Sequence, residues 1–177
     1  MTSIQIPQIS TQSQIIEFFE RTAGEWKSQR RYYTLNQDVE PEEVISIIKI
    51  EFLHQGSAPL VKLAGLHQLE ANALIGGTQV SWESNYIRSN RKALQGSTIF
   101  GVLENILYRD RGFATSKPVT AVCHLPNSST LCLKTEYGGS SFEEEIKLIG
   151  QQYRTRQTII SRAGEELMIG QYLEQRM

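Results

Sequence analysis

Two arginines in the last third of the chain, Arg154 and Arg156, have the residue type and spacing of an anion-binding site. They lie in the segment YRTRQTIIS, which has the β-branched composition of a strand. Because side chains alternate along a strand, both arginines share one face at a separation of about 7 Å, and Thr158 continues that face. Two adjacent guanidiniums present forked donors to a pair of carboxylates. The alternatives are a solvated strand face or one arginine stacked on Trp26.

A candidate acid, Glu136, lies on the strand before, on the face that also carries Lys134. Burial inside or at the rim of a cavity would raise its pKa and suit it to donate a proton. The alternative is an exposed carboxylate paired with Lys134 or with a neighbouring strand. The acidic run at residues 143–145 alternates between the two faces of a strand, so at least one of its carboxylates could be a charge at the rim. The run is interpreted as solvated, with an acid site as the alternative.

The element that opens this architecture is a long strand at residues 24–35, GEWKSQRRYYTL. An apolar helical stripe precedes it within residues 10–22, and Gly24 is placed to end that helix. The chain therefore begins as helix, glycine, tryptophan and strand.

The polarity of this strand predicts a cavity. If Trp26 points inward at the base, alternation puts Arg30 and Tyr32 on the same inner face. Arg30, Tyr32 and Tyr33 are then expected to line the mouth, where the tyrosines can stack on a ligand. Trp82, the second tryptophan, is a core anchor by composition and is included among the predicted ligand contacts.

The rest of the chain predicts further short strands, because alternating or β-branched segments recur at close spacing. These segments fall within residues 44–53, 73–87, 97–108, 119–125, 130–137, 141–149, 152–162 and 167–173. A helical pattern at residues 57–69 has Pro59 in its first turn and could cap one end of a barrel. The sequence thus predicts one mostly β domain over residues 1–177, a closed antiparallel barrel of eight to ten strands with an N-terminal helix and one further short helix.

Composition narrows the classes of partner. The 177 residues include 18 basic and 19 acidic side chains, and a net charge of -1 argues against a nucleic-acid partner held by phosphate contacts. Residues 1–9 lack the features of a signal peptide, and no apolar run reaches the roughly 18 residues of a membrane span. The sequence predicts a soluble protein without a membrane partner, located in the cytoplasm, or in the plastid stroma if the source is an alga.

Cysteine and histidine usage predicts neither a required disulfide nor a metal site. Cys123 and Cys132 flank the turn residues PNSS and are expected to be reduced, partly buried thiols, although a disulfide across the hairpin is conceivable. The histidines are scattered and show no metal-ligand spacing.

The opening segment also resembles a known family. Gly24, Glu25 and Trp26 fit the Gly-x-Trp motif of lipocalins, and the longer run FFERTAGEWKSQRRYYTL resembles the S/U-type phycobiliprotein lyases. The resemblance implies a barrel like those of lipocalins and fatty-acid-binding proteins, with structural roles for Gly24 and Trp26. It also implies a substrate, a linear tetrapyrrole (bilin) such as phycocyanobilin, with no prosthetic group. The activity implied is attachment of that bilin to a cysteine of an apo-phycobiliprotein.

This resemblance suggests roles for the candidate residues. Arg154, Arg156 and Arg30 would bind the bilin propionates, and Glu136 would act as an acid near the pyrrole nitrogens. Two alternatives remain at this point: a carrier of a fatty acid or other apolar carboxylate, and a scaffold subunit of a heteromeric lyase. The expected assemblies include a homodimer and a heterodimer with a related subunit.

Overall fold

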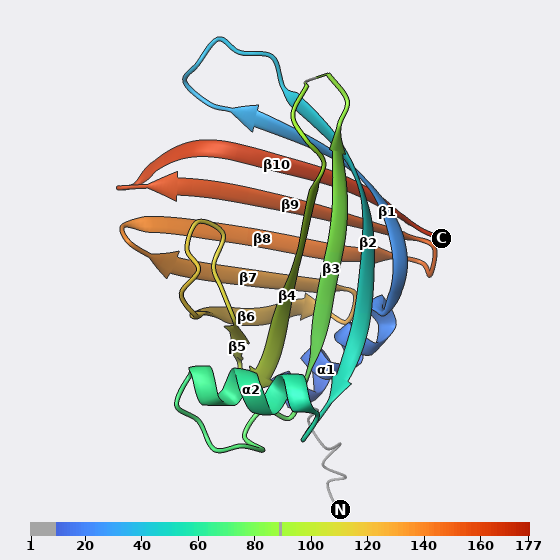
Figure 1. Ribbon diagram of the computed structural model, residues 1–177, viewed down its shortest axis with the longest axis vertical. Coiled ribbons are helices and arrows are strands. Elements are labelled where there is room, and N and C mark those ends of the chain that lie inside the picture. Colours follow the sequence, from blue (N-terminus) through green and yellow to red (C-terminus); the bar gives the residue numbers. More distant parts are fainter. Residues whose placement is uncertain (1–9, 89) are drawn as a thin grey trace, which may run out of the picture.

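Ten antiparallel strands close into a barrel in the computed structural model of the chain (Figure 1). The first strand pairs with both the second and the tenth, which closes the ring of strands. The structure describes residues 10–88 and 90–177, and the predicted absence of a signal peptide concerns residues 1–9, which lie outside the described part. The prediction of a mostly β antiparallel barrel with two helices is confirmed.

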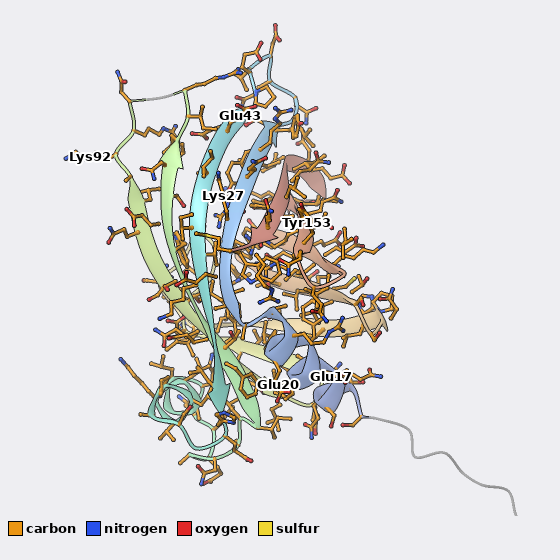
Figure 2. All side chains as sticks on the ribbon, turned by 90° about the vertical axis from the view of Figure 1, so that its right-hand side faces the viewer. Glu17, Glu20, Lys27, Glu43, Lys92 and Tyr153 are labelled. Carbon is orange, nitrogen blue, oxygen red and sulfur yellow. The ribbon has the colours of Figure 1, made fainter. Side chains whose placement is uncertain are left out.

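The elements follow one another as a meander, and each strand is hydrogen-bonded to its neighbour in the sequence. The two helices are α1 (Thr11–Thr22) and α2 (Ala58–Leu66). The ten strands are β1 (Gly24–Thr34), β2 (Glu42–His54), β3 (Gly76–Tyr86), β4 (Leu94–Leu103), β5 (Ile106–Arg109), β6 (Val119–Asn127), β7 (Thr130–Tyr137), β8 (Ser140–Ile149), β9 (Tyr153–Arg162) and β10 (Glu165–Arg176). Outward positions carry charged side chains, such as Lys27 of β1 and Glu43 of β2 (Figure 2).

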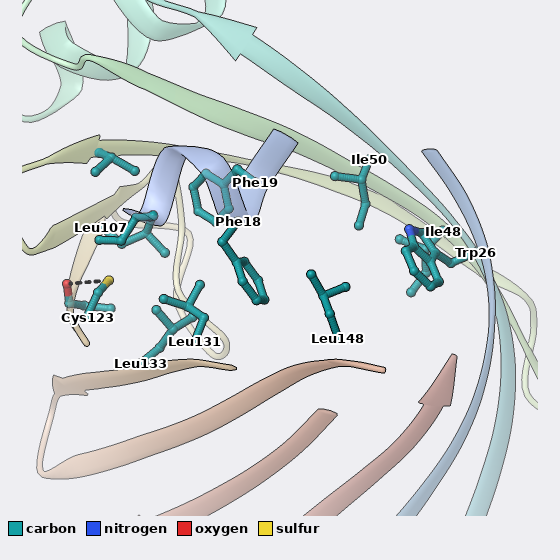
Figure 3. Close-up of a cluster of buried hydrophobic side chains, with 13 residues drawn as sticks. Phe18, Phe19, Trp26, Ile48, Ile50, Leu107, Cys123, Leu131, Leu133 and Leu148 are labelled. Carbon is teal, nitrogen blue, oxygen red and sulfur yellow. Dashed lines mark hydrogen bonds between the residues drawn. The ribbon is translucent and has the colours of Figure 1, made fainter. Parts of the chain in front are cut away.

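Helix α1 fills the base of the barrel. Ser10 caps it, because the Ser10 side-chain oxygen accepts a hydrogen bond from the Ser13 backbone N–H at 3.3 Å. The apolar stripe of the helix buries Ile15, Phe18 and Phe19 against the inner faces of the strands. Figure 3 shows Phe18 and Phe19 pointing from the helix into this buried cluster. Burial of these large side chains is the main force holding α1 in place.

Trp26 of β1 lies at the base and is fully buried. Its indole N–H donates to the Thr22 carbonyl of α1 at 2.9 Å. Two guanidiniums stack on its ring, that of Arg176 at 4.3 Å and that of Arg154 at 5.0 Å from the ring centroid. Arg176 also donates to the Ala23 carbonyl at 2.6 Å. The end of β10 is thereby tied to the junction of α1 and β1, a contact of Arg176 that the sequence did not reveal.

The second helix does not cap the barrel. Leu60 and Leu63 of α2 pack against the outside of β3 and β4, where glycines allow a close approach. A Cβ atom at Gly77 would lie 2.0 Å from the Phe100 carbonyl oxygen, and one at Gly101 would lie 3.1 Å from a Leu63 methyl. The expectation that this helix covers one end is wrong, because its apolar side meets an outer sheet face rather than the interior.

The two cysteines occupy opposite faces of their hairpin. Cys123 of β6 pairs with Leu133, whereas Cys132 of β7 pairs with His124, so the thiols do not face each other. Both are free, and burial raises the pKa of the Cys123 thiol to about 12. No helix in the described part of the chain is long and apolar enough to cross a membrane. No cluster of three or more metal-ligating side chains occurs among the described residues.

Candidate functional site

The barrel encloses a cavity of about 700 Å³, and its lining runs from Phe18 and Phe19 of α1 to Tyr86 and Leu94 at the far ends of β3 and β4. Phe18 and Phe19 form its floor, and residues 112–116 of the loop between β5 and β6 contribute to its wall. Its size and mixed lining are typical of a small-molecule site. The polar groups in the lining therefore decide what the cavity binds.

Cross-strand register gathers several of these polar groups on one wall. The inner faces of β1, β10 and β9 meet in three adjacent rows, because directly paired residues point to the same side of a sheet. The rows are Ser28–Glu174–Arg154, Arg30–Tyr172–Arg156 and Tyr32–Gly170–Thr158, and β8 extends the third row with Glu144.

The first row holds a buried ion pair. The Arg154 guanidinium donates to Glu174 through Nε at 2.7 Å and also through Nη2, and Ser28 Oγ donates to the other carboxylate oxygen at 3.2 Å. Burial acts to raise the pKa of the Glu174 carboxyl, but the Arg156 and Arg154 guanidiniums outweigh it and hold that pKa below its usual range. Arg154 thus stacks on Trp26 and binds Glu174, so most of its donors serve the protein itself.

The second row, which we term the arginine–tyrosine row, consists of Arg30, Tyr172 and Arg156. Both guanidiniums lie over the Tyr172 ring, with Arg156 at 4.4 Å and Arg30 at 5.4 Å from its centroid. Arg156 has only a long contact to Glu174, at 3.6 Å, and its buried Nε has no hydrogen-bond partner among the described residues. Burial opposes its charge, but Glu174, Tyr172 and Glu144 together raise the pKa of Arg156. This row presents a stable, incompletely satisfied positive charge to the cavity.

Strand alternation determines which of the aromatic residues predicted to contact the ligand line the cavity. Tyr32 lines the cavity and meets Tyr172 edge to face, with ring centroids 5.8 Å apart. Trp82 also lines it, under the Arg111 guanidinium at 5.2 Å. Tyr33 points outward into a separate surface groove and is not part of the cavity lining, so the expectation that it lines the mouth is wrong. The neighbouring position on a strand necessarily faces the other side of the sheet.

Glu136 lies on the outer face of β7, which contradicts the expectation that it lies inside or at the rim of the cavity. Its side chain is 64% exposed and pairs with Lys134 at 3.1 Å. The sequence placed Glu136 and Lys134 on one face, but Leu131, Leu133 and Thr135 occupy the inner face instead. The alternative interpretation of Glu136, an exposed carboxylate paired with Lys134, is therefore confirmed.

The acid that does line the cavity is Glu144 of β8, in the run interpreted as solvated. It pairs in register with Thr158 of β9 and with Leu133 of β7, two inward residues. A signal for this placement was present in the sequence, since Phe142, Glu144 and Ile146 alternate on one face. Glu174 and Tyr172 were also missed, although the same alternation holds along β10.

Arg109 at the end of β5, which no sequence motif indicated, lines the opposite part of the cavity. Its guanidinium lies between the rings of Phe100, at 4.7 Å, and Phe113, at 4.6 Å. Phe113 in turn stacks on Phe142 with centroids 4.7 Å apart. The loop after β5 is thus held over the cavity by aromatic contacts.

Comparison with known proteins places the chain in a family. The CpeS-like protein family matches residues 14–177. A relative from Nostoc sp. named "Putative phycocyanobilin lyase CpcS 2" is 64% identical, with 94% of this chain and 92% of the relative covered. A relative from Picosynechococcus sp. named "Putative chromophore lyase CpcV" is 53% identical, with 90% and 80% covered.

A solved structure agrees on the fold. The S-type phycobiliprotein lyase CPES from Guillardia theta matches with a TM-score of 0.78 and 23% identity, over 97% of this chain and 98% of that chain. The resemblance to phycobiliprotein lyases that the opening segment indicated is therefore confirmed, and the chain belongs to the CpeS-like protein family.

Proposed function

We propose that this protein is a phycobiliprotein lyase, which binds a linear tetrapyrrole and promotes its thioether attachment to a cysteine of an apo-phycobiliprotein. The observation that carries the proposal is the arginine–tyrosine row on the wall of a largely apolar cavity of about 700 Å³. A bilin combines an extended apolar ring system with two propionates, and such a cavity offers a complementary surface to both parts. The names of the Nostoc and Picosynechococcus relatives support the same activity.

The chemistry requires no nucleophile from the lyase. The acceptor thiol adds across the ethylidene double bond of ring A. The sulfur–hydrogen bond and the double bond break, a sulfur–carbon bond forms at one carbon, and the adjacent carbon gains a proton. The bilin is then a substrate rather than a prosthetic group. Holding the bilin in one conformation beside the thiol accelerates the addition chiefly through proximity.

Glu144 is the residue we assign to acid–base assistance, in place of Glu136. It lines the cavity and lies in the same row as Thr158 and Tyr32, whose polar groups can contact the ligand. A carboxyl group here can hydrogen-bond to the pyrrole nitrogens and polarise the conjugated acceptor for thiol addition. Arg30 and Arg156 would bind a propionate, while Arg154 would position them through Glu174.

The acceptor protein would approach the open end of the barrel. Leu94 and Phe113 line the cavity there, and they are 51% and 41% exposed. Exposed apolar side chains at the mouth suit contact with a protein partner. We further propose one catalytic domain over residues 1–177 acting in the cytoplasm or plastid stroma, as a homodimer or with a related subunit. A Picosynechococcus relative at 28% identity is named "Phycocyanobilin lyase subunit CpcS".

The alternative function is a non-catalytic carrier of an apolar carboxylate, since the cavity would also accept a fatty acid. The decisive experiment mixes the purified protein with phycocyanobilin and apo-phycobiliprotein, and then measures bilin that stays on the acceptor after denaturation. If the protein is a lyase, bilin attaches to the acceptor faster than in the same mixture without the protein, and the product has a single absorbance spectrum. Equal attachment with and without the protein, together with tight binding of bilin or fatty acid, would identify a carrier.

A further inference from the structure

Arg109 is a buried charge without an ion-pair partner among the residues that the structure describes. The residue is only 8% exposed, and no ion pair to it forms within residues 10–88 and 90–177. Its Nε atom is buried without a hydrogen-bond partner in that part of the chain. Removing a guanidinium from water without a carboxylate partner is costly, so such a group is uncommon unless it serves a ligand.

The surroundings of Arg109 hold it in a fixed orientation. The Arg109 guanidinium lies over two aromatic rings, those of Phe100 and Phe113. The Arg109 backbone carbonyl shares a hydrogen bond with the His67 ring at 2.8 Å, and the next residue, Asp110, accepts from Thr98 Oγ1 at 2.7 Å. A rigid guanidinium between two rings can direct its free donors into the cavity at little entropic cost on binding.

The position of Arg109 separates it from the arginine–tyrosine row. Three strands, β6 to β8, lie between β5 and β9 on one side of the barrel, and five lie between them on the other. Arg109 and the arginine–tyrosine row therefore occupy facing walls of one cavity. Burial lowers the pKa of the Arg109 guanidinium, the Glu144 carboxylate acts to raise that pKa, and the Arg156 guanidinium acts to lower it. The charges of Glu144 and Arg156 are therefore close enough to affect Arg109 across the cavity.

We propose that Arg109 is the subsite for a second carboxylate of the ligand, facing the first subsite at Arg30 and Arg156. Because Arg154 is bound to Glu174, the wall with Arg30 and Arg156 has donors for one carboxylate. The opposite wall has the Arg109 guanidinium, which forms no ion pair among the described residues. The cavity is then built for a dicarboxylate that spans it, and a monocarboxylate such as a fatty acid satisfies only one wall. This inference rests on the proposed bilin function and specifies how the bilin is held.

The test compares phycocyanobilin with its dimethyl ester, which has the same ring system without the two charges. Absorbance titrations are made with wild type, Arg109→Gln, and the exposed control Arg88→Gln, whose side chain is 73% exposed. Arg109→Gln is expected to weaken binding of the diacid on the order of 10- to 100-fold and to leave ester binding unchanged. Arg88→Gln is expected to change neither.

A stability measurement separates a ligand subsite from a structural residue. Because Arg109→Gln removes an unpaired buried charge, the melting temperature without ligand is expected to be equal to or above that of wild type, while the rise induced by bilin is smaller. If Arg109→Gln is unstable, Arg109→Lys replaces it in the test. Lysine keeps the positive charge beside the two rings but lacks the forked donors of the guanidinium, so it is expected to weaken binding of the diacid and not of the ester. Equal weakening of diacid and ester, or unchanged diacid binding, would overturn the inference.

These results also distinguish the inference from the proposed function. If wild type binds neither the diacid nor the ester, both fail together. If wild type binds and transfers the diacid but Arg109→Gln binds it equally well, the lyase function stands and the Arg109 subsite is excluded.

Discussion

Arg154 and Glu174 are 20 residues apart in the sequence and form an almost fully buried ion pair across β9 and β10. Glu174 lies in the row next to the arginine–tyrosine row, and its carboxylate also contacts Arg156 at 3.6 Å. This pair joins two parts of the molecule, since Arg154 stacks on Trp26 at the base and Arg156 lines the cavity. Its integrity is therefore expected to matter both for folding and for the position of the ligand contacts.

Breaking this pair is expected to destabilise the fold. Arg154→Ala leaves the buried Glu174 carboxylate with Arg156, at 3.6 Å, as its remaining cationic partner among the described residues, and the free energy of unfolding should fall by about 3 to 5 kcal/mol. Chemical denaturation measures this change, with Arg162→Ala at an exposed end of β9 as the control. A loss of bilin affinity without a loss of stability would mean that Arg154 acts as a ligand contact.

The same pair predicts a pH dependence. The folded-state pKa of Glu174 is lowered, so its contribution to stability is present above the unfolded pKa of about 4.3 and is lost as pH falls through the folded pKa. Wild type should exceed Glu174→Gln in unfolding free energy at neutral pH, and the difference should shrink below about pH 4.3. Denaturation curves of both proteins from neutral to acidic pH test this, and a constant difference would contradict it.

Trp26 is expected to be essential for the stability of the barrel base. Its ring is fully buried between two guanidiniums, and Trp26→Ala should cost about 3 to 5 kcal/mol. Trp82→Ala is the comparison, because Trp82 is partly exposed and lines the cavity. The Trp82 variant should lose bilin affinity with a smaller loss of stability. A Trp26→Ala melting temperature equal to that of wild type would refute this role.

Removing the Arg156 guanidinium should weaken bilin binding with little loss of fold. Glu174 keeps Arg154 as its partner in Arg156→Gln, so the buried carboxylate stays compensated. The expected loss of binding free energy is roughly 1 to 3 kcal/mol, the range for a charged hydrogen bond. Titration with the diacid bilin and its dimethyl ester provides the measurement, and an equal loss for both ligands would argue against carboxylate binding.

Glu144 and Glu136 offer a matched pair of substitutions, one inside the cavity and one outside. Glu144→Gln keeps the size and most hydrogen bonding of the side chain, so bilin should still bind while the transfer rate falls by about 10²-fold or more. Glu136→Gln, whose carboxylate is exposed, should transfer at the wild-type rate. Single-turnover transfer under saturating bilin gives both rates. The reverse order of effects would return the acid role to Glu136.

Local sequence patterns were sufficient to predict the helices, the strands and the two faces of each strand. Hydrophobic periodicity and glycine placement predicted α1, α2 and the barrel, since these signals act over a few residues. Alternation correctly grouped Trp26, Arg30 and Tyr32, and likewise Arg154 and Arg156. These groupings depend only on local backbone geometry, and so the printed sequence contains them.

Closure of the barrel determines which face of each strand is inside and which distant residues come into contact. Alternation groups Glu144 with Phe142 and sets Glu136 opposite Leu133, but the pairing of β7 and β8 in the closed barrel is what turns Glu136 outward and Glu144 into the cavity. The partnership of Arg154 with Glu174 and the enclosure of Arg109 depend on register between strands. Register follows from closing the whole barrel around one core, so no local stretch of sequence could specify it.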